Sequence, residues 1–233
     1  MAVPEASSSM SPIMYTSLIE MYRNAVESYS KSDSKVFPQY EINFMTHHAL
    51  AVLPLAVTVW ESHLNEQILA MTPFLGYSVL SQSKELTDLV ERADIKAKSV
   101  ILPKLAYGET FDKSAQPYQD FIKLVDIRNS IVHFKPYNYP KKTINYLEDK
   151  RVTLIPEEGA RYSWPLMLYS SESMRWAINT VCSMILELDK FSKQYRGESG
   201  ISLFFKPISV ERAKLIFEEF NVNPSNISKK YRN

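Results

Sequence analysis

Cysteine and glycine are scarce in this chain of 233 residues, which contains one cysteine and five glycines. The single cysteine, Cys182, excludes an intramolecular disulfide framework and is typical of a protein of the reducing cytoplasm. The glycines are scattered and none precedes a Lys-Ser or Lys-Thr pair, which excludes a glycine-rich phosphate loop. The four histidines match no zinc-binding spacing. We therefore expect a cytoplasmic protein without a metal or another cofactor.

The chain also lacks a long hydrophobic run and an excess of charge of either sign. Its most apolar stretch, residues 49–60, is about a dozen residues long and contains Pro54, so it is too short to span a bilayer and indicates a buried helix. With 27 basic and 26 acidic residues, no global field indicates a nucleic-acid partner. Residues 1–11 are rich in serine and lack the regions of a signal peptide, so we expect a short disordered lead and no membrane attachment.

Apolar residues recur at three-and-four spacing over most of the chain, which predicts an all-α protein built as an antiparallel helical bundle. Ser11 and Pro12 form a typical opening for the first helix, and Pro54 should kink or split the second. Residues 103–117 read as a loop that contains Gly108. The expected helices are residues 12–30, 43–70, 83–102, 120–134, 171–195 and 209–220.

Residues 137–169 break the helical rhythm and form an insertion in the helical domain, residues 12–195. Within it, residues 151–155 and 162–166 flank a turn-forming segment at 156–159, which predicts a short β-hairpin that either shapes substrate access or covers the bundle. Residues 197–200 read as a hinge to a C-terminal segment, residues 201–233, with a short helix and a basic tail.

The most informative motif is Arg128-Asn129-Ser130-Ile131-Val132-His133. An Arg-Asn pair followed by a histidine at this spacing should arise by chance in about one chain in a hundred of this composition. A guanidinium can bind a phosphate, and a histidine near the end of a helix can hold or release a proton near neutrality. By itself, however, an arginine on a helix is most often a surface charge or the partner of a structural carboxylate.

Helical geometry separates the motif's side chains. At about 100° per residue, Asn129 and His133 lie one turn apart on the same face, with Asp126 beside them. Arg128 projects from the apolar arc instead, and an unpaired charge there would be unfavourable. Glu61, on the border of the apolar stripe of residues 43–70, is our candidate partner for Arg128. Because Arg128 and His133 do not share a face, a site completed by a second copy of the chain is more natural than a site within one chain.

Residues 126–134 resemble the signature of the HEPN superfamily, small all-α domains named for higher eukaryotes and prokaryotes nucleotide-binding. That signature is an arginine, a polar residue directly after it and a histidine four to six residues after the arginine, and Arg128, Asn129 and His133 match it position for position. Residues 55–65, with Glu61, resemble the early family helix that carries a glutamate, and residues 174–181 resemble the helix after the motif. The resemblance covers residues 12–195, and the insertion at 137–169 departs from it.

The resemblance implies a homodimeric, metal-independent endoribonuclease in which two motifs face each other. His133 would be the acid or base, Arg128 would hold the scissile phosphate, and Asn129 would position the phosphate or His133. Glu61 and Asp126 would support them. HEPN nucleases serve as toxins opposed by antitoxins and in host defence, so an antitoxin or defence protein is a possible partner.

A local excess of cations surrounds the motif. Residues 121–151 contain seven cations and three anions, with tyrosines interleaved, as a groove for single-stranded RNA requires. The alternative is an ordinary solvated loop. Our candidate RNA-binding residues are Lys123, Lys135, Tyr137, Lys141 and Lys142.

Two other functions remain open from the sequence. One is a catalytically inactive HEPN module that binds nucleotide, RNA or a partner protein. The other is a purely structural helical bundle, which predicts a monomer whose Arg128 is paired inside the chain.

Overall fold

The computed structural model describes residues 9–31, 45–71, 88–90, 92–135, 139–153, 164–168, 170–196 and 205–221. Within these residues the structure is helical and contains no strand, so the expected all-α class is confirmed for them. The α-helices are α1 (Met10–Lys31), α2 (Met45–Met71), α5 (Ile95–Tyr107), α6 (Tyr118–Val132), α7 (Lys141–Asp149), α8 (Ser171–Arg196) and α9 (Val210–Glu219), with a 3-10 helix η1 (Trp164–Leu168) before α8.

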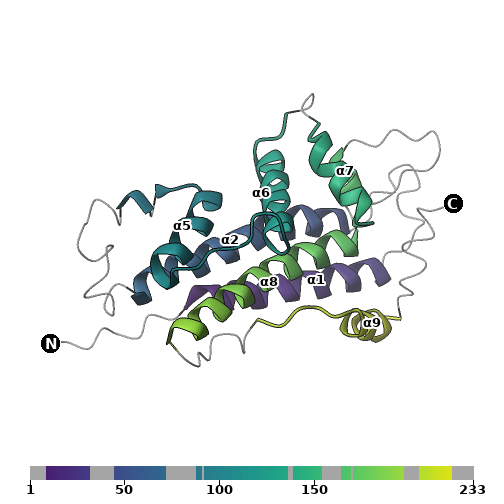
Figure 1. The fold of residues 1–233 in the computed structure, drawn as a ribbon. Helices are drawn as coiled ribbons and strands as arrows, with labels where there is room; N and C mark the ends of the chain where they lie inside the picture. Colours follow the sequence, from purple (N-terminus) through teal and green to yellow (C-terminus); the bar gives the residue numbers. More distant parts are fainter. Residues whose placement is uncertain are drawn as a thin grey trace.

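The three longest helices, α1, α2 and α8, lie side by side and form the centre of the molecule (Figure 1). Helix α1 runs antiparallel to α2 and α8 in Figure 1. In agreement, Ser11 near the start of α1 bonds to Glu66 near the end of α2. Each of the three buries an apolar stripe against its neighbours, and Leu18, Trp60 and Ile178 are fully inaccessible to solvent. This shared core is the support on which the other helices pack.

Helix α6 stands steeply on α2 and α8 in Figure 1 and buries Phe121, Leu124 and Ile127 against them. Trp60 of α2 lies at this junction. Its indole nitrogen donates a 2.8 Å hydrogen bond to Ser99 of α5, and its ring meets Phe121 edge-on at 6.0 Å between centroids. The packing of Trp60 therefore fixes where α5 and α6 sit on α2.

Helix α5 corrects our expectation of a helix over residues 83–102 followed by a loop. It begins after Asp94, whose carboxylate accepts from the backbone of Lys96 and Ala97, and it passes through Pro103 to Tyr107. Gly108 ends it in the left-handed conformation at φ 73°. Because Pro103 and Tyr107 are buried, packing offsets the hydrogen bond that a proline removes. Residues 88–90 are helical, and residues 83–87 lie outside the described residues.

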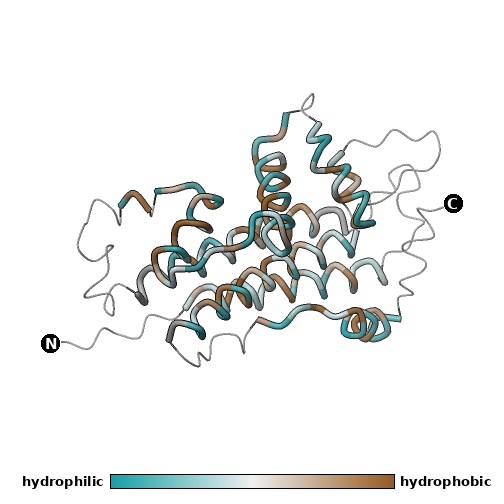
Figure 2. Tube along the Cα trace, in the orientation of Figure 1, coloured by the Kyte–Doolittle hydropathy of each residue, from teal (hydrophilic) through white to brown (hydrophobic). Residues whose placement is uncertain are grey.

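Helix α7 overturns the expectation that residues 137–169 are non-helical. It buries Thr143, Ile144 and Leu147 on one side and exposes charge on the other. Figure 2 shows this alternation of hydrophilic and hydrophobic residues along both α7 and α9. Trp164 to Leu166, expected in the second strand of the hairpin, lie in η1 instead. The turn between the expected strands falls outside the described residues, as does the expected hinge at 197–200.

The expected start of the first helix was wrong, and so was the split at Pro54, which was one of the two alternatives, a kink or a split, for the second helix. Helix α1 begins at Met10, and the Ser11 hydroxyl donates to Glu66 of α2 at 2.6 Å instead of capping its own helix. Helix α2 is one helix with Pro54 inside it, so the expected split does not occur. In both cases contacts between helices outweigh the local signal.

The C-terminal segment packs onto α1 and α8. Ser209 caps α9 by accepting from the backbone of Arg212 at 3.0 Å, as the predicted helix over residues 209–220 requires. The side-chain amide of Asn179 in α8 both donates to and accepts from the backbone of Ile208, at 3.0 and 2.8 Å. Residues 205–221 thus share the core of the bundle through Phe205 and Ile208. None of the helices in the described part of the chain has the length and apolar character needed to cross a membrane.

Candidate functional site

The motif lies at the free end of α6, away from the crossing with α8 (Figure 1). The last helical residue is Val132, and His133 is the residue that ends the helix, with φ −107° and ψ 43°. Its backbone N–H donates to the carbonyl of Asn129 at 2.9 Å. The expected helix over residues 120–134 is therefore observed over Tyr118–Val132, and His133 follows its last turn instead of lying within it.

Arg128 is paired with Glu61, as the sequence predicted. Its Nη2 lies 3.7 Å from the Glu61 Oε2, and the two side chains are 27% and 34% exposed. Such a long, partly exposed ion pair stabilises the fold by less than about 1 kcal/mol. The guanidinium has five N–H donors, so the pairing leaves some of them for a phosphate.

Asn129 contacts Arg128 and not His133. Its side-chain oxygen accepts from the Arg128 Nη1 at 3.0 Å, and its side chain is exposed. Among the described residues Asn129 thus makes no hydrogen bond to His133, one of the two groups that we expected it to position. Glu61 and Asn129 therefore both contact the guanidinium of Arg128.

His133 is exposed, and its ring has no hydrogen-bond partner among the described residues. The apolar neighbours Val132 and Phe134 are also exposed, to 57% and 50%. Phe134 contacts Trp164 of η1, with ring centroids 6.0 Å apart. An open histidine flanked by exposed apolar side chains lacks the enclosure that acid/base chemistry usually has. A second surface would have to supply it.

Asp126 does not join the motif. Its carboxylate lies 2.5 Å from the ammonium of Lys96 in α5, in an ion pair whose side chains are about a third exposed. It therefore ties α6 to α5. The expectation that Asp126 acts beside His133 gains no contact from this geometry.

The candidate RNA-binding residues follow α6 and α7. The Lys123 ammonium lies over the ring of Tyr146, 5.6 Å from its centroid, in a cation–π contact. Tyr137 lies outside the described residues. The other candidates are exposed at the end of α6 and the start of α7: Lys135, Lys141 and Lys142.

Sequence reasoning missed a polar cluster where the start of α6 meets the end of α7. The Asp120 carboxylate accepts from the Tyr146 hydroxyl at 2.9 Å and from the Lys150 ammonium at 2.8 Å. Partial burial opposes the charge of Lys150, but the hydrogen bonds to Asp120 and Tyr146 outweigh it and raise the pKa of Lys150. No local pattern indicates this cluster, because 30 residues separate Asp120 from Lys150.

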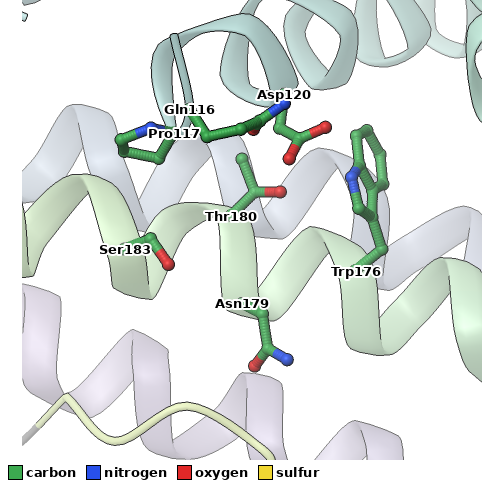
Figure 3. A pocket seen from close by; sticks show the side chains of 7 residues that line it. All are labelled: Gln116, Pro117, Asp120, Trp176, Asn179, Thr180 and Ser183. Carbon is green, nitrogen blue, oxygen red and sulfur yellow. The ribbon is translucent and has the colours of Figure 1, made fainter. Parts of the chain in front are cut away.

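A pocket of about 310 Å³ lies beside this cluster, between the start of α6 and the middle of α8 (Figure 3). Its residues come from segments about 60 positions apart, so only the fold reveals it. The lining residues are Gln116, Pro117, Asp120, Trp176, Asn179, Thr180 and Ser183.

His63 is a buried histidine on α2, outside the motif. Burial lowers the pKa of His63 to about 4, although the charges of Glu66 and Asp189 oppose that shift. Ser11 lies 3.4 Å from its Nδ1, but Ser11 is itself buried, so a substrate cannot reach the pair. Among the described residues no group of three histidine, cysteine or acidic side chains is placed to hold a metal ion.

Comparison of the chain with protein-family models, with curated proteins and with solved structures found no match. The function is therefore argued from the side chains at the ends of α6.

Proposed function

We propose that this chain is a metal-independent endoribonuclease of HEPN type that acts as a homodimer. The observation that carries the proposal is the arrangement at the end of α6. There Arg128 is held by Glu61 and Asn129, while His133 stands exposed at the helix terminus. A fixed cation and an open proton-transfer group are what cleavage of a phosphodiester without a metal requires.

The proposed reaction is attack by the 2′-oxygen of the RNA on the neighbouring phosphorus. The new bond joins the 2′-oxygen to phosphorus, and the bond from phosphorus to the 5′-oxygen of the next nucleotide breaks. One His133 takes the proton of the 2′-hydroxyl, and a protonated His133 gives a proton to the leaving 5′-oxygen. Arg128 stabilises the charge that grows on the phosphate. The products are a cyclic phosphate and a free 5′-hydroxyl.

Two histidines suit this reaction better than one, and a dimer supplies them. Arg128 and His133 lie five residues apart, so their directions on α6 differ by about 140°. A second motif opposite the first would place the Arg128 of one chain near the His133 of its partner. The exposed Val132 and Phe134 beside His133 offer apolar surface for such a contact.

The direct test is cleavage of single-stranded RNA in the presence of EDTA. Replacement of His133 by Ala should abolish detectable cleavage, since acid/base catalysis contributes roughly 10²- to 10⁴-fold. Ser130→Ala is the matched control, because Ser130 lies on the same helix and its hydroxyl bonds only to the Asp126 carbonyl one turn earlier. Equal cleavage by wild type and His133→Ala would refute the assignment.

A catalytically inactive HEPN module and a purely structural helical bundle are the other candidates, and the ion pair of Arg128 with Glu61 is the pairing that the structural bundle predicts. That pair lies within one chain, as a structural or binding role for Arg128 also requires. Expression of an active nuclease should slow growth, as a toxin or defence nuclease does, and His133→Ala should restore growth. An inactive module that binds RNA or a partner protein would leave growth unchanged in both forms.

A further inference from the structure

The pocket beside Asp120 is separate from the motif. Asp120 and His133 are thirteen residues apart on α6, which corresponds to about 20 Å at 1.5 Å per residue. The pocket lies where α6 rests on α8, and the motif lies at the opposite end of the helix (Figures 1 and 3). Its volume of about 310 Å³ is at the lower end of the range for small-ligand sites.

One wall of the pocket comes from α8 and combines a flat aromatic ring with hydroxyl groups. Figure 3 shows the Trp176 indole with its nitrogen on the side that faces Thr180 and Asp120. That nitrogen is buried and has no hydrogen-bond partner among the described residues, which costs about 1 to 3 kcal/mol. Thr180 and Ser183 line the same wall, and each hydroxyl can donate or accept. A planar ligand that carries hydrogen-bond acceptors fits this wall.

The opposite wall comes from the start of α6 and carries no net charge. Asp120 is matched by Lys150 at 2.8 Å and accepts from Tyr146 as well. Because this carboxylate lies in the first turn of α6, it also offsets the positive end of the helix dipole. An anion inside the pocket would therefore gain little electrostatic attraction. A neutral heteroaromatic ring would leave the ion pair of Asp120 with Lys150 intact.

Lys123 is a cation near the pocket, although it does not line it. Lys123 lies one turn after Asp120 on α6, and its ammonium rests over the Tyr146 ring at 5.6 Å. Among the described residues it has no carboxylate within ion-pair distance. A neutral pocket with an aromatic wall, and near it a cation that has no carboxylate partner among the described residues, match the two parts of a nucleotide, a base and a phosphate.

We propose that this pocket binds the base of a nucleotide, stacked on or beside Trp176, while Lys123 holds the phosphate. The site requires neither catalysis nor a dimer. If the chain is a ribonuclease, which rests on the proposed function, the site holds a base of the RNA about 20 Å along α6 from the cleaved bond.

Calorimetric titration with the four ribonucleoside 5′-monophosphates and their nucleosides tests the proposal. At least one monophosphate should bind the wild-type chain. Ser183→Leu should weaken the binding of nucleoside and monophosphate roughly tenfold by filling the pocket. The control Ser17→Leu places the same change on α1, where the hydroxyl bonds only to its own helix, and should bind as the wild type does. Thr180→Val keeps the shape and removes one hydroxyl, so it should weaken binding even if the leucine variant misfolds.

Lys123→Ala separates the two parts of the ligand. It should weaken the monophosphate about fivefold and leave the nucleoside unchanged. Absence of binding at millimolar nucleotide, or equal binding by wild type, Ser183→Leu and Thr180→Val, would overturn the proposal. So would an equal effect of Lys123→Ala on nucleoside and monophosphate. Failure of the proposed function would appear as unchanged RNA cleavage by His133→Ala, whereas failure of this site would appear as unchanged nucleotide binding by Ser183→Leu and Thr180→Val, so the two failures are separate outcomes.

Discussion

The Arg128 guanidinium lies 3.7 Å from the Glu61 carboxylate, and this ion pair joins the last turns of α6 to the middle of α2. Glu61, on α2, thus contacts the guanidinium of Arg128 from outside the motif helix α6. The contact is long and about a third exposed, so its consequences for function should exceed its consequences for stability.

Replacement of Glu61 by Gln should therefore lower the free energy of unfolding by less than about 1 kcal/mol. It should reduce RNA cleavage more strongly, because the guanidinium is then held by Asn129 alone. Urea unfolding measures the first effect and the cleavage rate the second. An unchanged urea midpoint together with unchanged cleavage would show that the pair does not position Arg128.

The exposed apolar surface beside His133 should be a contact between two chains. Val132→Asp should shift the protein from dimer to monomer in sedimentation experiments and abolish cleavage, with the helical content unchanged. Leu215→Asp is the matched control, since Leu215 on α9 is 63% exposed compared with 57% for Val132. A monomeric wild-type chain, or a Val132→Asp variant that stays dimeric, would contradict this surface.

Buried His63 should make stability depend on pH. Its pKa is 6.5 when unfolded and about 4 in the folded chain, because burial disfavours the imidazolium. Between these values the unfolded chain binds a proton that the folded chain does not. The contribution of His63 to the free energy of unfolding is therefore fully present above about pH 6.5. It is lost as the pH falls toward 4, by up to roughly 1.4 kcal/mol per pH unit.

His63→Gln is the variant that tests this window. Urea unfolding at several pH values between 7 and 4.5 should show a flatter dependence for the variant than for the wild type. The same slope in both chains would assign the pH dependence to other groups.

The paired hydrogen bonds of Asn179 with Ile208 should anchor the C-terminal segment. Asn179→Ala removes both and leaves a backbone N–H and carbonyl without their partner, which should cost about 1 to 3 kcal/mol. Limited proteolysis should then cut near α9 sooner than in the wild type. Glu219→Ala is the control, because it removes only an exposed ion pair with Arg23. Equal proteolysis of Asn179→Ala and the wild type would contradict the anchor.

Several features of the fold could be predicted because their signals are local. The helix over residues 171–195 and the cap at Ser209 follow from periodicity and capping alone. Helix α7 was missed because it is short and mostly polar, and its buried side, Thr143, Ile144 and Leu147, is defined only by packing in the folded chain. Pro54 and Pro103 misled the prediction in another way, since tertiary packing keeps both within helices.

Some contacts of the candidate site could likewise be predicted from the sequence, and others could not. The pairing of Arg128 with Glu61 could be inferred because a half-buried guanidinium needs a carboxylate. The partner of Asp126 could not, because Lys96 reaches it from a helix whose position the sequence does not define. The pocket beside Asp120 was equally hidden, since its walls come from two helices that meet only in the folded chain.

The contacts of Arg128 also decide which hydrogen bonds the motif can offer. The side-chain oxygen of Asn129 accepts from Arg128, and the Oε2 of Glu61 faces the guanidinium, so these two acceptor oxygens are engaged by Arg128. The groups that the side chains of Arg128 and Asn129 can still offer a ligand are N–H donors. These two side chains therefore form a surface of donors, which selects a ligand rich in acceptor oxygens and disfavours one that must itself donate.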